Sequence, residues 1–439
     1  MRGTVGYRKM RHVRNMPLKQ STRSNGRPHP PAWPDPDAVT CPFDFHQALD
    51  FDPLLADLVA RGPVTRVRLP YGDTEAWLVL SFDGVRRVTT DPRFSRAAIV
   101  GRDYPRLTPE PIVSPESVNV LDPPRSGRLR RAAARAFTKK RVERMTPAVE
   151  RVTHRLLDAM ADHGPPADLA HHLSAPLPHQ TICELLGVDP ADRPVLLRRT
   201  HRMLATAPAA RRAAADAKRY LREYFTGLVV ERRRAPGDDL ISAMAGDGDG
   251  DGAGGEGDEP LSDEELAVLA VTLVLSGNDT AACQIGNIVH SLLTRPGRWA
   301  ALADDPGRLP AVLDELLRLI PFRKGVGIPR VALEDVEVEG VRIRAGDFVH
   351  VSYLAANRDP AVFRDPHELD PDRPAHPHMA FGWGGHHCVA APLALAELRV
   401  AVGALLARFP GLRLAVPAGE VEWDTATIRR FPLRLPVRW

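Results

Sequence analysis

The sequence is poor in several features that would each point to a particular class of protein. Its 439 residues contain four cysteines, too few for a disulfide scaffold, which favours a reduced, cytoplasmic setting. Aromatic residues make up 6% and charged residues 26%, which fits a globular chain and excludes a fibrous or disordered one. The longest apolar stretch, residues 266–275, is about half a membrane span, so we expect no transmembrane helix and no membrane.

The first 30 residues contain no acidic residue and no apolar run like the core of a signal peptide. They carry eight basic residues, and without them the formal net charge changes from +4 to −4. Their Ser, Asn, Gly and Pro content predicts a disordered basic extension over residues 1–38. The extension is either a functional basic arm or a non-functional addition, for example from a start codon assigned too early.

Residues 246–259, GDGDGDGAGGEGDE, carry six acids and no base. Without both biased segments the formal charge is +2, so the positive excess is local and does not indicate a nucleic-acid partner. The Asp-Gly alternation partly resembles a calcium loop, but a loop that starts at Asp247 has Asp258 at the twelfth position, where calcium loops need Glu. The alternative is a flexible acidic linker inside a single domain of residues 39–439.

The rest of the chain is mainly helical, with a smaller β region. Alternating apolar residues over 62–80 predict two strands joined at 71–73. Helical patterns cover residues 128–136, 140–162, 176–187, 191–206 and 210–234.

The longest predicted helix spans residues 263–294. Ser262 is a good N-cap, Glu265 completes a capping box, and Arg295-Pro296 ends the helix. At about 1.5 Å per residue the helix would be near 50 Å long and would cross the core. Its middle holds the polar stretch Ser276-Gly-Asn-Asp-Thr280, which is costly to bury and is therefore either a satisfied kink or a functional site.

The most specific pattern is FGWGGHHCVAAPLA at residues 381–394. A glycine-rich turn delivers Cys388 to the start of an apolar helix over about 389–408, where backbone N–H groups favour a thiolate. A lone cysteine is usually a core residue, but the neighbouring glycines and histidines favour a ligand. Three consecutive ligands suit zinc poorly, and an adjacent His is badly placed as the base of a nucleophile. A single thiolate on a haem iron fits best.

This segment resembles the haem-binding loop of the cytochrome P450 family, F-G-x-G-x-[HR]-x-C-x-G. The matching positions are Phe381, Gly382, Gly384, His386 and Cys388. Ala390 replaces the last glycine, which adds one methyl group where helix and haem meet. The resemblance implies that the matching residues bind haem b, with Cys388 as the iron ligand. It also implies the P450 fold, with the haem between the long central helix and the Cys-loop helix.

Further segments match the family in order and spacing, and the resemblance covers about residues 40–439. Glu315-Leu-Leu-Arg318 resembles the E-x-x-R motif, although such a pair alone is usually a surface salt bridge. The polar stretch resembles [AG]-G-x-[DE]-T with Ser276 at the first position, which implies that Asp279 and Thr280 are catalytic and relay protons. Stretches that match bacterial members are residues 91–95, 121–124 and 357–366.

The resemblance also implies partners for the haem propionates. Arg330 and His386 match propionate-binding positions, and Arg130 matches the arginine of the early basic helix. Family members often have His four residues before that arginine, where this chain has Ser126.

The basic helix is either a solvated face or a docking face for an acidic electron donor. Its residues are Arg128, Arg130, Arg131, Arg135, Lys139, Lys140, Arg141 and Arg144. The chain has no glycine-rich dinucleotide motif and no iron–sulfur cysteine set, so a separate ferredoxin and ferredoxin reductase are expected.

The implied function is a bacterial monooxygenase that uses O2 to hydroxylate or epoxidise a small organic substrate in natural-product metabolism. The alternatives are oxidative ring closure or aryl coupling, and a non-catalytic haem-thiolate sensor or binding protein. The implied pocket lining is the loop 97–118, Leu275, Ala281, residues 322–328 and residues 425–428. Arg323 and Lys324 in this lining either bind a substrate carboxylate or face solvent or a propionate.

Overall fold

The computed structural model describes residues 39–41, 43, 48–245, 260–374 and 376–439, which all belong to one compact unit. The predicted basic extension, residues 1–38, and the predicted acidic linker, residues 246–259, lie outside the described residues. The boundaries of the single domain stay a prediction.

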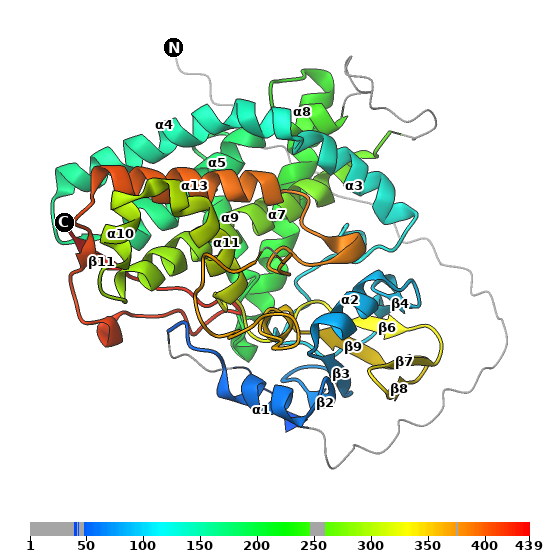
Figure 1. Ribbon diagram of the computed structural model, residues 1–439. Helices are drawn as coiled ribbons and strands as arrows, with labels where there is room; N and C mark the ends of the chain where they lie inside the picture. Colours follow the sequence, from blue (N-terminus) through cyan, green and yellow to red (C-terminus); the bar gives the residue numbers. More distant parts are fainter. Residues whose placement is uncertain (1–38, 42, 44–47, 246–259, 375) are drawn as a thin grey trace. The chain divides into compact units, whose positions relative to one another are not determined.

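The helices predicted from the sequence are present. Figure 1 shows most helices gathered on one side of the unit, whereas α1 and α2 lie beside the larger sheet on the other. In chain order the helices of the described residues are α1 (Pro53–Arg61), α2 (Phe82–Thr90), α3 (Arg125–Ala136), α4 (Lys139–His163), α5 (Pro176–Leu185), α6 (Arg193–Arg202), α7 (Arg211–Arg234), α8 (Leu240–Ala245), α9 (Asp263–Leu293), α10 (Arg298–Asp304), α11 (Leu309–Leu319), α12 (Tyr353–Ala356) and α13 (Ala391–Arg408).

One helix is shorter than the sequence predicts. The pattern over 191–206 predicts a helix to residue 206, but α6 ends at Arg202. Leu204 accepts a hydrogen bond from the Ile428 backbone N–H, and Ala205 forms a β-bridge with Thr427. Pairing with this late segment of the chain replaces the last helical turn, which local periodicity cannot reveal.

The larger sheet has the strand order β1-β2-β3-β9-β6-β4, and two small sheets, β7-β8 and β10-β11-β5, accompany it. The strands are β1 (Val39–Thr40), β2 (Val64–Arg68), β3 (Ala76–Val79), β4 (Phe94–Ser95), β5 (Ala167–Asp168), β6 (Arg330–Ala332), β7 (Val336–Val338), β8 (Val341–Ile343), β9 (Phe348–Val351), β10 (Arg413–Leu414) and β11 (Pro436–Arg438). β2 and β3 are antiparallel, with Val64 opposite Val79, which confirms the predicted strand pair. The same sheet fixes Arg330 at the start of β6.

The long helix α9 runs through the helical core and packs against α5, α6, α7 and α13. Its predicted capping box is present, because the Ser262 side chain accepts from the Glu265 N–H and the Glu265 side chain accepts from the Ser262 N–H. Among the described helices α9 is the one long and apolar enough to cross a membrane, but 61% of its most apolar window is buried inside the protein. That is the environment of a core helix.

The polar stretch of α9 does not interrupt the helix, which is continuous through residues 276–280. A Cβ atom on Gly277 would lie 3.1 Å from Cγ1 of Ile182 on α5. The glycine therefore has a packing role, since it lets α5 approach α9 closely.

Candidate functional site

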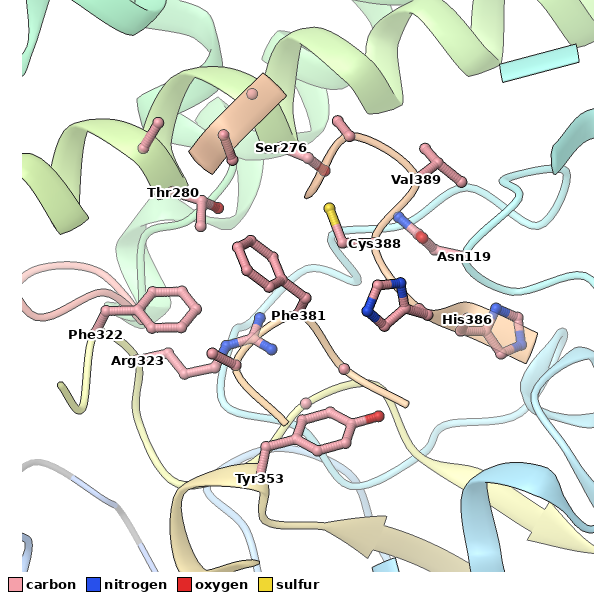
Figure 2. Close-up of a pocket in the computed structure, with 18 of the residues that line it drawn as sticks. Asn119, Ser276, Thr280, Phe322, Arg323, Tyr353, Phe381, His386, Cys388 and Val389 are labelled. Atoms are coloured by element: carbon pink, nitrogen blue, oxygen red, sulfur yellow. The ribbon is translucent and has the colours of Figure 1, made fainter. Parts of the chain in front are cut away.

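A cavity of about 320 Å³ lies between α9, the loop before α13 and the segment after α11. Figure 2 shows the Cys388 sulfur pointing into it, with Phe381 beside the sulfur and with Ser276 and Thr280 on the α9 side. Most other residues of its wall are apolar, including Leu273, Ala281 and Val326. The cavity thus joins the two polar motifs that the sequence singled out, although they are more than 100 residues apart.

The glycine-rich turn before Cys388 has a shape that other residues could not adopt. Gly384 has φ +68°, and a Cβ atom there would lie 2.3 Å from the Thr89 carbonyl oxygen on α2. The Cys388 N–H donates to the Phe381 carbonyl at 2.8 Å, which closes the turn. The turn therefore fixes the direction of the sulfur before any ligand binds.

Cys388 differs from the other three cysteines, which are fully buried core residues as predicted, because it is only half-buried and lines the cavity. Burial raises the pKa of the Cys388 thiol, against the opposing effects of a hydrogen bond from the Ala390 N–H and the charge of Arg130. A free thiol in this place favours its neutral form, and a metal cation in the cavity would be needed to hold the thiolate.

A cluster of basic side chains, of which Arg96, Arg130 and His386 line the cavity, has no carboxylate partner among the described residues. Arg330 is 1% exposed, and neither of its terminal guanidinium nitrogens has a hydrogen-bond partner. Burial and the charges of Arg96, Arg330 and Arg130 lower the pKa of His386 to about 2. The Nδ1 atom of His386 also has no partner. Such a buried cluster is costly unless an anionic group completes it, and the two propionates of haem fit this requirement.

Arg96 is a member of this cluster that the sequence analysis did not single out. It is 7% exposed, lines the cavity and donates from Nη1 to the Asn119 carbonyl at 3.0 Å. Asp122 holds it in place by accepting from the Arg96 backbone N–H at 3.0 Å and from the Ser95 hydroxyl. The matching stretches 91–95 and 121–124 therefore meet in space, and a basic residue directly after the first of them was the available signal.

Thr280 and Asp279 take different positions on α9. Thr280 lines the cavity, whereas Asp279 lies behind the cavity wall and is 9% exposed. The Asp279 Oδ1 atom accepts from the Asn278 side chain at 3.3 Å, and Oδ2 has no partner. Burial raises the pKa of Asp279, while the charges of Arg429 and His201 oppose the shift. The carboxyl group can therefore hold a proton more readily than an exposed aspartate.

The pair Glu315 and Arg318 is not a surface salt bridge. It is buried and belongs to a larger hydrogen-bond network with Arg373, which we call the knot. Arg318 donates to both Glu315 carboxylate oxygens at 2.7 Å and to the Asn357 and Pro366 carbonyls at 2.7 Å. Arg373 donates to the same carboxylate at 3.0 Å. Burial alone would raise the pKa of Glu315, but these cations lower it. The knot ties α11 to the segment that leads into the cysteine loop.

The residues expected to line a substrate pocket are only partly brought together. Ala281 and residues 322–328 line the cavity, except for Lys324, and from the loop 97–118 only Val118 reaches it. Leu275 faces a separate small pocket with Met203 and Val113. None of residues 425–428 lines the cavity, but the next residue, Arg429, does.

Comparison with known proteins agrees with this geometry. A family model described as Cytochrome P450 matches residues 308–418. The chain is 43% identical over 404 residues to nocardicin C N-oxygenase of Nocardia uniformis subsp. tsuyamanensis, covering 92% of this chain and 99% of that protein. It is 41% identical over 423 residues to biflaviolin synthase of Streptomyces coelicolor, covering 96% and 100%.

Solved structures give the same result. The crystal structure of cytochrome P450mel 107F1 with biaryl coupling reactivity has a TM-score of 0.88 and 55% identity, covering 92% of this chain and 100% of that one. These matches confirm the fold, the haem-thiolate cofactor and the monooxygenase activity in bacterial natural-product biosynthesis that the sequence predicts. Such enzymes take electrons from redox partners and act on small molecules. The chain therefore belongs to the cytochrome P450 family.

Proposed function

We propose that Cys388 would bind the haem iron and that the protein oxygenates a small natural-product intermediate beside Thr280. The observation that carries this proposal is the shared cavity, which has the Cys388 sulfur on one side and the Thr280 hydroxyl on α9. When bound, the haem supplies the activation of O2 and the transfer of one oxygen atom to the substrate.

The residues that hold the haem follow from the cavity wall. Arg96, Arg330 and His386 would hold the propionates, because each has a buried nitrogen without a partner among the described residues. Arg130, which lines the cavity and donates to the His387 carbonyl, would add a further positive charge. Phe381 and Gly382 line the cavity next to Cys388, and Gly384 shapes the turn. The apolar residues of the wall exclude water, which strengthens each of these charge interactions.

Proton supply falls to the polar stretch of α9. The Thr280 hydroxyl can donate a hydrogen bond into the cavity, and the Asp279 carboxyl group behind it can hold and release a proton. The two residues are neighbours on α9, so a proton released by the Asp279 carboxyl group has only a short distance to cover to the Thr280 hydroxyl in the cavity.

The electron donor in this proposal is a separate ferredoxin, reduced by a ferredoxin reductase, in the cytoplasm. The basic face of α3 and the start of α4 supports it, because Arg131, Arg135, Lys139, Lys140 and Arg144 are exposed there. Complementary charge on a small acidic donor would speed the encounter and make the rate depend on salt.

The test is turnover of the haem-loaded protein with a surrogate ferredoxin system, followed by mass spectrometry of the product under labelled O2. We expect one labelled oxygen atom in the product. In Thr280→Ala we expect at least about a tenfold loss of product per NADPH consumed, because one positioned proton donor contributes a factor of about 100 to 10,000. Unchanged product yield in this variant would contradict the role of Thr280.

A second candidate function is oxidative coupling of two aromatic rings, in which no oxygen atom enters the product. The observation that favours it is similarity: the structure at 55% identity is described with biaryl coupling reactivity, and biflaviolin synthase is 41% identical. The same experiment decides between the two, since a dimeric product without label indicates coupling.

A further inference from the structure

Two arginines on the cavity wall have no role in the haem site described above. Arg323 follows α11 and Arg429 follows the segment 425–428, and their backbones form an antiparallel β-bridge. Both side chains line the cavity. Both guanidinium groups also approach the ring of Phe322, with their central carbons 5.8 Å and 5.7 Å from the ring centroid.

Neither guanidinium group has an acidic partner among the described residues, since no carboxylate oxygen lies within 4 Å of either. Arg429 is 7% exposed, and its Nε atom has no hydrogen-bond partner. The Nε atom of Arg323 is likewise buried without a partner. Figure 2 shows the Arg323 guanidinium lying within the pocket, near Phe381 and Tyr353.

Two neighbouring cations in one buried wall repel each other and are costly to desolvate. Burial and the charge of Arg429 lower the pKa of Arg323 to about 10, so the group is still a cation at neutral pH. The Nε atoms of both arginines therefore lack an acceptor, and the nearby Asp279 carboxyl group, on which the Arg429 charge acts, has a pKa that burial itself shifts toward the protonated form. In the proposed haem site the propionates take other partners, namely Arg96, Arg330, Arg130 and the neutral imidazole of His386.

We propose that Arg323 and Arg429 form a subsite for the anionic group of an aromatic substrate, either an ionised carboxyl group or an acidic ring hydroxyl. The Phe322 ring lies within 6 Å of both guanidinium groups and lines the cavity, where it can pack against the substrate ring. The inference rests on the proposed function, and it adds the class of substrate: an aromatic acid or an acidic phenol.

The place of Lys324 supports the choice of these two residues. It is next to Arg323 in sequence, yet it does not line the cavity, and its backbone N–H is bonded to the Ile428 carbonyl at 2.9 Å. A basic residue in this segment therefore does not line the cavity merely because of its place in the sequence. Lys324 provides a matched control, because its removal changes the net charge equally.

The test is calorimetric binding of three probes to the haem-loaded, resting full-length protein. The probes are naphthalene-2-carboxylate, its neutral amide, and 4-nitro-1-naphtholate, which has an ionised hydroxyl group. We expect at least one anion to bind at least tenfold more tightly than the amide. The preferred anion shows whether the subsite takes a carboxylate or a phenolate.

Substitutions then assign the preference to the two side chains. Arg323→Gln and Arg429→Gln should each weaken binding of the preferred anion about 10- to 100-fold, because each removes a charge-assisted hydrogen bond. Binding of the amide should stay within about threefold, Arg323→Lys should recover part of the anion affinity, and Lys324→Gln should change neither.

Two results would overturn the inference. In the first, the unsubstituted protein binds the anions and the amide with equal affinity, and Arg323→Gln does not change these affinities. The second is faster haem loss from Arg323→Gln together with equal weakening of all three probes, which would make Arg323 a propionate partner. Because the probes bind without turnover, this test is separate from the proposed function, whose failure would appear as a turnover product without labelled oxygen.

Discussion

The protein buries arginines in two different ways. Arg318, 2% exposed, is paired with Glu315 and three backbone carbonyls, and Arg373 completes the knot around the same carboxylate. Arg330, 1% exposed, is equally buried, but its terminal nitrogens have no partner. The first arrangement is complete within the chain and holds the fold together. The second is incomplete and marks where a ligand with negative charge belongs.

The largest loss of stability is expected when the fully paired Arg318 is replaced. Arg318→Met would remove the main cationic partner of the Glu315 carboxylate and the donor of three backbone carbonyls, which lowers the free energy of unfolding by about 3–5 kcal/mol. We expect a large fall in the denaturation midpoint and little haem-loaded protein. The control is Arg342→Gln, which breaks the exposed pair with Asp335 and should leave the midpoint unchanged. Equal midpoints for the two variants would show that the knot is not structural.

A smaller effect on stability, and one of opposite sign in the haem-free protein, is expected when the unpartnered Arg330 is replaced. Arg330→Met removes a buried cation without a partner, so the haem-free protein should become as stable as, or more stable than, the unsubstituted chain. The haem-loaded variant should lose haem to an acceptor globin about 10- to 100-fold faster, because the proposed charged contact of Arg330 with a propionate is gone. A haem-free variant that is clearly destabilised would place Arg330 with the structural arginines.

The last prediction concerns a buried acid on α13, whose effect on stability depends on pH. Glu397 lines the cavity, and burial raises its pKa to about 8, against the opposing effect of a hydrogen bond with Thr181. Between about pH 4.5 and 8 the unfolded chain ionises this group while the folded chain keeps its proton, so stability falls as pH rises.

This dependence can be measured from denaturant midpoints at several pH values. The slope that Glu397 contributes is at most about 1.4 kcal/mol per pH unit, and Glu397→Gln should remove it. The substitution should thus stabilise the protein at pH 8 more than at pH 5. Parallel pH profiles for both proteins would contradict a protonated Glu397.

Local patterns predicted much of this structure. The capping box of α9, the strand pair β2–β3, the cysteine loop and the Glu315–Arg318 pair all depend on residues close in sequence, and all are present. Ala390, the departure from the family pattern, has φ −96°, a conformation that does not require glycine. The missing glycine therefore leaves the cysteine loop intact.

Other features depend on contacts between distant segments. Successive residues of a helix point about 100° apart, and the packing of α9 places Thr280 and Ala281 on the cavity but Asp279 behind its wall. Arg96 reaches the cavity because Asp122 holds its backbone, and Arg429 does so because its backbone bridges to Arg323 and residues 204–206 pair with the preceding residues 426–428. The sequence pattern around Arg96 or around Arg429 does not predict these long-range contacts.

The claim that Cys388 alone binds the haem iron is tested most directly by the carbon monoxide difference spectrum of the reduced protein. The account predicts the haem-thiolate band for the unsubstituted protein and for Cys283→Ala, a buried cysteine outside the cavity wall. It predicts loss of that band in Cys388→Ser, with the fold retained by circular dichroism. A haem-thiolate band that persists in Cys388→Ser would contradict the account.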